Sequence, residues 1–246
     1  MTRRRGRGAA LGTLVVVAVA VALFVASGRG ASVDPGSAGT ATSSAAAPTA
    51  EASGAPPAPA SVDAAAARTL LGGLAVRPWA TGARYDRTAD FGDAWIDVDR
   101  NGCDTRNDVL ARDLSGVRRS STCKVLSGLL TSPYSGARIS FVKGPRTSEL
   151  VQIDHVVALS DAWRTGAQNL SPEQRVAFAN DPLELLAVDG ASNDDKGSQD
   201  ASAWLPADAG YRCAYVTRQI RVKAKYRLWV TASERGALLR VLSGCP

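Results

Sequence analysis

The stretch Glu149-Leu150-Val151-Gln152-Ile153-Asp154-His155-Val156-Val157-Ala158-Leu159 decides the fold. Its apolar and β-branched residues predict a strand that ends in an Asp-His pair. His155 is the only histidine in a chain of 246 residues. Such a pair is either a structural hydrogen-bonded pair or a catalytic group, and the segments downstream favour the second.

Two later segments complete a pattern with this strand. The run Asn180-Asp181-Pro182-Leu183-Glu184-Leu185-Leu186-Ala187-Val188 predicts a second apolar strand, and Ser192-Asn193-Asp194-Asp195-Lys196-Gly197 predicts the opening of a helix. This order resembles the HNH endonucleases of the His-Me finger (ββα-metal) group. It is similar to the branch that supplies the C-terminal nuclease domain of GmrSD-type modification-dependent restriction enzymes and that also occurs as small secreted bacterial proteins. The specific motifs cover about residues 149–206, and residues 95–114 also look like the secreted branch, without an assigned role.

The resemblance implies an α+β fold with a ββα-metal core, extra helices and short strands, and an enzyme that hydrolyses phosphodiester bonds with one divalent cation. It assigns His155 as the general base, and Asp154 and Asn193 as metal ligands. Oxygen ligands of this kind suit Mg²⁺ or Mn²⁺. Lys196 lies one helical turn after Asn193, so we expect it to bind the scissile phosphate or to form a surface pair with Asp200. The expected substrate is nucleic acid, above all DNA, with RNA as a second option.

The implied base also predicts a pH dependence. Because a general base must be neutral, activity is expected to fall as the pH drops through roughly 6 to 7. The family implies products with 5′-phosphate and 3′-hydroxyl ends.

The chain differs from the simplest form of this pattern in one place. Many HNH proteins carry Asn immediately before the Leu of the second strand, where it braces the loop that holds the histidine, and this chain has Glu184 there. We expect either Asn180 or Glu184 itself to make those hydrogen bonds. An ideal strand also points Asp154 and His155 to opposite faces, so sharing one site requires a bend or bulge at the strand end.

The N-terminus predicts export. A basic start with four arginines precedes an uncharged apolar run, so residues 1–28 are expected to be a signal peptide or an uncleaved signal anchor. Residues 29–62 are rich in Ala, Ser, Pro and Gly and predict a disordered linker. Residues 63–246 suffice for one nuclease domain. The protein is therefore expected to be secreted or anchored on the outer face of the cell membrane, and to contact the membrane only through the N-terminal segment if that segment is uncleaved.

Local patterns predict further elements. Helices are expected over about 61–71, 105–114, 171–179 and 232–242, the third opened by a capping box of Ser171 and Gln174. Short strands and turns are expected between Val125 and Val142. Residues 220–230 alternate apolar with basic side chains, which predicts a half-buried strand whose cationic face contacts nucleic-acid phosphates. That face comprises Arg221, Lys223, Lys225 and Arg227.

The cysteines predict a disulfide framework. All four lie in the expected domain, and an even count in an exported chain indicates two disulfides. No Cys-x-x-Cys pair is present, which with the single histidine argues against the usual zinc sites. Of the three possible pairings, Cys103–Cys123 and Cys213–Cys245 are favoured because each closes a local loop.

A second cation site is suggested by residues 97–108. Asp97, Asp99 and Asn101 occupy positions 1, 3 and 5 of a calcium loop with glycine at position 6, and Asp108 stands at position 12 where Glu is usual. A structural Ca²⁺ is one expectation. The alternatives are an Asp/Asn/Gly turn held by a cysteine, or a contact of Asp104 or Arg106 with the catalytic centre.

Two other functions remain open at this level. An exported wall- or polymer-binding module would retain the ββα element without catalysis, which Glu184 and the calcium-like loop favour. A glycan hydrolase with paired carboxylates, such as Asp97 and Asp99, would keep its activity without His155.

Overall fold

A computed structural model of the chain describes residues 63–82 and 84–246. The expected signal segment (1–28) and linker (29–62) lie outside the described residues. Among those described, no helix has the length and apolar character needed to cross a membrane.

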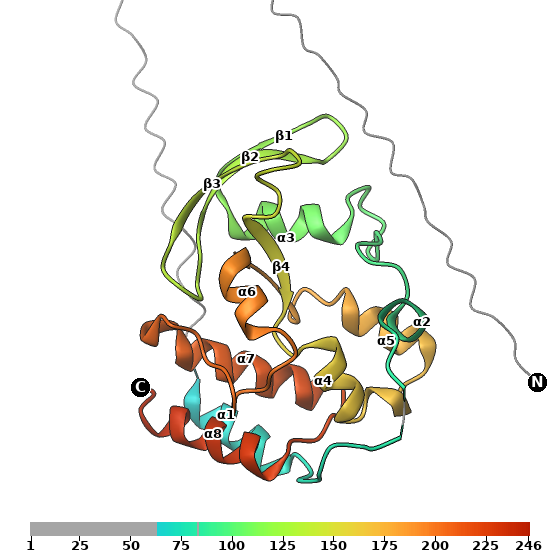
Figure 1. Cartoon of the computed structure of the whole chain (residues 1–246), viewed down its shortest axis with the longest axis vertical. Helices are drawn as coiled ribbons and strands as arrows, with labels where there is room; N and C mark the ends of the chain where they lie inside the picture. The colour runs from blue at the N-terminus through green and yellow to red at the C-terminus, as the bar shows by residue number, and fades with distance from the viewer. Residues whose placement is uncertain (1–62, 83) are drawn as a thin grey trace, which may run out of the picture. The chain divides into compact units, whose positions relative to one another are not determined.

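The centre of the fold is a two-stranded antiparallel ribbon followed by a helix. Strand β4 (Val151–His155) pairs with β5 (Leu185–Asp189), and α6 (Gly190–Lys196) begins directly after β5. Figure 1 shows α6 lying beside β4. The connection between the strands contains α4 (Leu159–Arg164), the 3-10 turn η1 (Ala167–Asn169) and α5 (Pro172–Ala179). The strand–strand–helix order and the mixed α+β class are thus confirmed.

This ribbon separates two apolar cores, because successive residues of a strand point to opposite faces. Leu186 and Val188 pack into the larger core, whereas Leu185 and Ala187 pack into the smaller one. All five residues of β5 are therefore buried.

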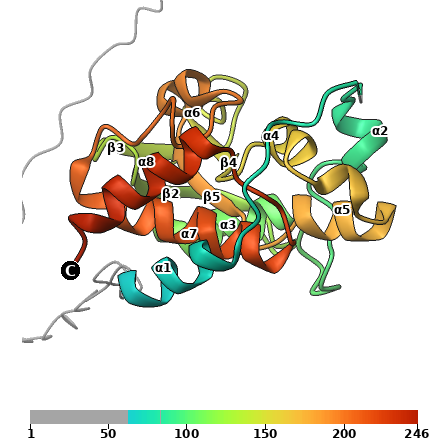
Figure 2. The same cartoon turned by 90° about the horizontal axis from the view of Figure 1, so that it is seen from below.

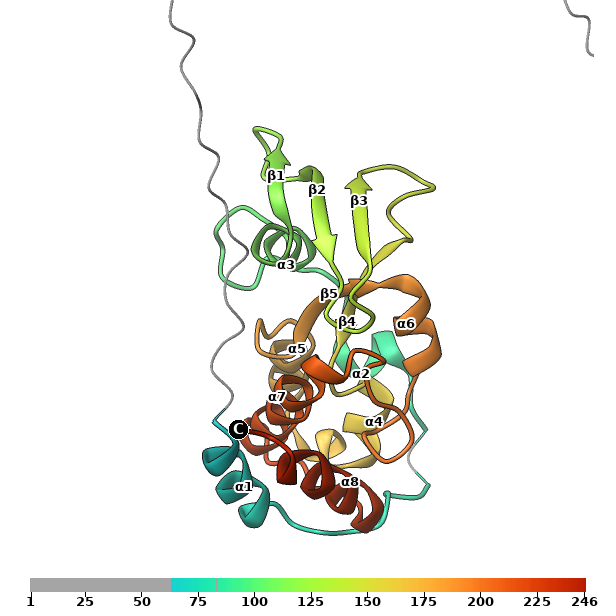
Figure 3. The same ribbon diagram turned by 90° about the vertical axis from the view of Figure 1, so that its left-hand side faces the viewer.

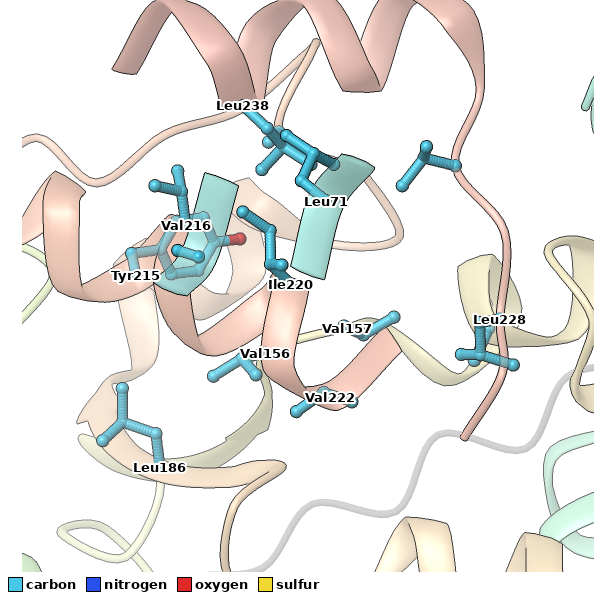
Figure 4. Close-up of a cluster of buried hydrophobic side chains, with 14 of the residues drawn as sticks. Leu71, Val156, Val157, Leu186, Tyr215, Val216, Ile220, Val222, Leu228 and Leu238 are labelled. Carbon is cyan, nitrogen blue, oxygen red and sulfur yellow. The ribbon is translucent and has the colours of Figure 1, made fainter. Parts of the chain in front are cut away.

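The larger core is helical. It is built by α1 (Ala64–Gly73), α7 (Arg212–Lys225), preceded by the 3-10 turn η2 (Ala209–Tyr211), and α8 (Ala232–Ser243). These three helices pack on one another in Figure 2. Figure 4 shows Leu71, Ile220 and Leu238 from the helices, with Val156, which follows β4, and Leu186 of β5. Each fully buried aliphatic side chain of this kind contributes about 1.5–3 kcal/mol.

The smaller core lies under a second sheet. Helix α3 (Thr105–Asp113) packs against β5 and against the antiparallel sheet β1 (Ser115–Arg119), β2 (Val125–Thr131) and β3 (Arg138–Val142), in the order β1-β2-β3. Val109, Leu110, Leu130 and Phe141 are buried there. In Figure 3 this sheet extends away from the helices of the larger core.

Most local predictions are confirmed. Helices α1, α3, α5 and α8 match their expected ranges, and the Ser171–Gln174 capping box is formed. Both favoured disulfides, Cys103–Cys123 and Cys213–Cys245, are present. Helices α2 (Arg87–Phe91), α4 and α7 were not expected.

The strand predicted over residues 220–230 is wrong, because α7 continues to Lys225. Tyr215, Val216, Gln219, Ile220 and Lys223 are buried at helical spacing, and this period prevails over the alternation that begins at Ile220. The helix buries side chains that a strand would have exposed.

The cationic face expected on that strand is also not formed. Lys223 is fully buried and pairs with Asp161 and Glu234, and Lys225 pairs with Asp181. Arg221 and Arg227 alone of the four are exposed and outside these pairs.

Candidate active site

A cavity of about 570 Å³ lies at the end of β4. It is lined by Asp154, His155 and Asn193, the three residues that the sequence assigned to base and metal. Side chains from distant segments complete it, among them Arg87 of α2 and Arg106 of α3. The fold therefore brings together the expected base and both expected ligands.

His155 is held as a neutral imidazole. The ring is 7% exposed, and its Nε2–H donates to the Ala179 carbonyl oxygen at 2.9 Å. Since a carbonyl only accepts, Nε2 carries the proton and Nδ1 keeps the free lone pair. The ring also stacks on Trp95, with 6.1 Å between centroids.

Burial, followed by the positive charge of Arg87, lowers the pKa of His155 to about 3. The ring is therefore neutral well below pH 6. The sequence predicted that activity falls between roughly pH 7 and 6 because His155 becomes protonated. The lowered pKa of the buried ring does not support that prediction.

Asp154 points to the opposite side of the ribbon from His155. Its Oδ2 accepts from the Tyr134 hydroxyl and its Oδ1 accepts from Lys196 Nζ at 2.9 Å. The pairing of β4 with β5 runs without a register shift through both residues. The expected bulge is therefore absent, and the two side chains line one cavity because it wraps around the strand end.

Lys196 does not take either of the positions that the sequence predicted, at the scissile phosphate or beside Asp200. Its side chain is fully buried, and Nζ donates to Asp154 Oδ1 and to the His155 carbonyl oxygen, both at 2.9 Å. It is not among the residues that line the cavity, and its partner is Asp154 rather than Asp200. Lys196 thus orients Asp154 and the strand end instead of facing a phosphate.

The side chain of Asn193 is held in place by a hydrogen bond to Gln152 of β4. Its Nδ2 donates to Gln152 Oε1 at 2.7 Å, which leaves Asn193 Oδ1 as an open acceptor. The start of α6 fits closely against the loop before β4, because a Cβ on Gly190 would collide with the Glu149 carbonyl oxygen. Glycine at this position lets the helix approach the ribbon.

Glu184 makes the bracing contacts that the family pattern gives to Asn. Its carboxylate accepts from the Val157 backbone N–H, at 3.1 Å from Oε1, and its carbonyl accepts from Val156 N–H. Burial raises the pKa of Glu184 well above its usual range. Asn180 does not brace this loop, since its Nδ2 donates to Val176 within its own helix.

Two arginines flank His155: Arg106, whose contact with the catalytic centre was one expectation from the sequence, and Arg87, which the sequence did not assign. Arg106 Nη2 donates to the Val151 carbonyl at 3.0 Å and to the Ser148 carbonyl at 3.4 Å, which fixes the guanidinium at the cavity wall. In the part of the chain that the structure describes, neither Arg87 nor Arg106 is ion-paired with a carboxylate. Of the alternatives for residues 97–108, the contact of Arg106 with this site is the one the cavity supports.

The calcium-like loop is compact but organised by its own hydrogen bonds. Asp97 accepts from the backbone of Asn101 and Gly102, and Asn101 Nδ2 donates to Asp99 and Asp108. Asp104 caps α3. A structural Ca²⁺ in this loop stays a prediction.

The cavity offers oxygen donors of the kind that bind a divalent cation. The Asp154 carboxylate has lone pairs beyond those used by Tyr134 and Lys196, and Asn193 Oδ1 is open. Over residues 63–82 and 84–246, no three His, Cys, Asp or Glu side chains are grouped to hold a metal. The cation would therefore rest on one carboxylate, one amide oxygen and water, the set that Mg²⁺ commonly accepts.

The fold and the cavity define an α+β protein whose strand–strand–helix unit places His155, Asp154 and Asn193 in one cavity, which Arg87 and Arg106 also line. Residues 104–241, more than half of the chain, match the family described as "GmrSD restriction endonucleases, C-terminal domain", and the chain belongs to this family. A fungal relative from Arthroderma benhamiae, named as an uncharacterized secreted protein, is 39% identical over 184 residues, which cover 74% of this chain and 86% of the relative. No solved structure matches the chain.

Proposed function

We propose that this protein is an exported, metal-dependent endonuclease of the HNH type that hydrolyses phosphodiester bonds in DNA. The observation that carries the proposal is the state of His155: buried, neutral, tied through Nε2 and free at Nδ1. A nuclease needs a base at this point because the attacking water must lose a proton. Membership of a family named for restriction endonucleases supports a nucleic-acid substrate.

The other cavity residues supply the remaining parts of such a reaction. Nδ1 of His155 would take the proton from water, and Arg87 and Arg106 would neutralise charge on the phosphate. Asp154 and Asn193 would hold one Mg²⁺ or Mn²⁺, which stabilises the departing oxygen when it is bound. Tyr134 and Lys196 would keep Asp154 in place.

Export is part of the proposal. The similarity to a protein named as secreted supports a location outside the cell. Two disulfides are consistent with an oxidising compartment.

The test is cleavage of supercoiled plasmid by the purified protein with Mg²⁺, with Mn²⁺ or with EDTA. We expect nicking and degradation only with metal, and a loss of at least about 10²-fold in His155→Ala, the size of a general-base contribution. Asn193→Ala should also lose metal-dependent activity. Asn169→Ala is the matched control, since Asn169 is exposed and outside the cavity.

Two outcomes would contradict the proposal. If no variant and no metal gives cleavage of DNA or RNA, the chain is better explained as an exported wall- or polymer-binding module. If His155→Ala retains full hydrolytic activity, a carboxylate mechanism such as the one with Asp97 and Asp99 becomes the better explanation.

A further inference from the structure

The segment between Asp113 and Glu149 has an unusual charge. Residues 114–148 contain six basic residues and no acidic one. They form the sheet β1–β3 and the loop that returns to β4. The six cations are Arg118, Arg119, Lys124, Arg138, Lys143 and Arg146.

All six side chains are exposed, and none takes part in an ion pair with any described residue. The register places Arg118 opposite Ser127 and Arg138 opposite Thr131, so both arginines share one face of the sheet. Leu130 and Phe141 point to the other face, which is buried in the smaller core. Arg118 and Arg138 therefore lie on the outer face of the sheet.

This face continues to the candidate active site. Lys143 follows β3, with its N–H bonded to the Leu126 carbonyl, and Arg146 lies in the next turn of the same loop. Two residues further on, the Ser148 carbonyl accepts from Arg106 of the cavity wall. Arg106, Arg146 and Lys143 therefore connect the cavity wall with the outer face of the sheet.

We propose that the outer face of β1–β3 and the β3–β4 loop bind the phosphate backbone of a nucleic-acid duplex beyond the bond that is cut. The proposal rests on the proposed nuclease function. Six unpaired cations beside a phosphodiester site are complementary to a polyanion. β2, with seven residues, spans roughly 23 Å, over half of a duplex turn.

The same surface argues against a single strand as its ligand. Proteins that hold single strands stack the bases on exposed aromatic rings. The aromatic residues of the segment are Tyr134 and Phe141, and both are buried. The exposed side chains of the segment are mainly arginine, lysine and small hydroxyl residues, with Leu126 and Val142 as exposed apolar ones. Such cations contact phosphates without reading the sequence.

The experiment compares the wild type with the double variant Arg118→Gln/Arg138→Gln. Binding to a duplex of about 30 base pairs, roughly three helical turns, is measured in EDTA over a range of salt, and cleavage is measured separately with metal. Removing two phosphate contacts should weaken binding roughly tenfold near 0.1 M salt and reduce the slope of log K against log salt by about 2. KM should rise while kcat stays constant, and the unpaired single strand should be affected less.

The matched control is Arg77→Gln/Arg240→Gln. Both arginines are exposed, and they lie after α1 and in α8, at the far end of the fold from the sheet in Figure 1. This control should bind like the wild type. An unchanged affinity and salt slope in Arg118→Gln/Arg138→Gln, or an equal loss in the control, would overturn the inference. Because binding is measured without metal, an absence of cleavage would count against the nuclease and not against this surface.

Discussion

At the scale of single residues, the site depends on charges that are buried in pairs. Asp154 and Lys196 are 6% and 0% exposed, and the attraction between them offsets part of the cost of burying each charge. From the sequence alone, Asn193 was expected to hold the metal, and Lys196 to bind the scissile phosphate or to pair with Asp200. The structure separates them, since Asn193 lines the cavity and Lys196 lies behind Asp154.

This difference predicts the effect of Lys196→Met. Removing the ammonium leaves an unpaired buried carboxylate, so the free energy of unfolding should fall by about 3–5 kcal/mol. Urea denaturation measures it. Lys225→Met is the control, since Lys225 is half exposed and its pair with Asp181 should contribute less than about 1 kcal/mol. A phosphate-binding Lys196 would instead leave stability unchanged and reduce only activity.

At the scale of elements, α7 and α8 are joined by a buried charge cluster. Lys223 of α7 pairs with Asp161 of α4 at 3.0 Å and with Glu234 of α8 at 2.6 Å. Glu234 also completes the capping box of α8 with Thr231. Burial raises the pKa of Glu234 to about 7, against the attraction of Lys223.

The raised pKa predicts how stability depends on pH. A carboxyl that is harder to ionise in the folded state than in the unfolded state contributes stability that is lost as the pH rises from about 4.5 through about 7. The loss from this group should be about 3 kcal/mol. Glu234→Gln keeps an acceptor for the cap and cannot ionise, so its stability relative to the wild type should rise between pH 5 and 7.5. Parallel stability curves for the two proteins would contradict the prediction.

At the scale of the whole described domain, the ribbon β4–β5 divides two cores, and each core is closed by one disulfide. Cys213–Cys245 ties the start of α7 to the segment after α8, across 32 residues. Cys103–Cys123 ties the loop before α3 to the turn between β1 and β2, across 20 residues. Neither bond lies in the cavity wall.

Loss of the longer disulfide, Cys213–Cys245, is therefore expected to lower the free energy of unfolding without preventing catalysis. Cys213→Ala/Cys245→Ala should lower the free energy of unfolding by about 3–4 kcal/mol, because the unfolded chain regains loop entropy. Calorimetry gives the change, and plasmid cleavage at 25 °C should be retained. Loss of cleavage by a variant that is still folded would show that this bond also shapes the site.

The sequence by itself determined what depends on neighbours along the chain. The Ser171 and Gln174 cap, the ββα order and the grouping of His155 with Asp154 and Asn193 follow from short patterns and from one resemblance. The tertiary structure alone decided what depends on long-range packing: that Lys223 is buried in a helix, that Glu184 braces the histidine loop, and that Arg106 reaches the cavity. The pattern of residues 220–230 is compatible with a strand and with part of a helix. Which of the two forms depends on which side chains the rest of the fold buries. Burial also lowers the pKa of His155, so its neutral state below about pH 6 is a property of the folded protein and not of its neighbours in the sequence.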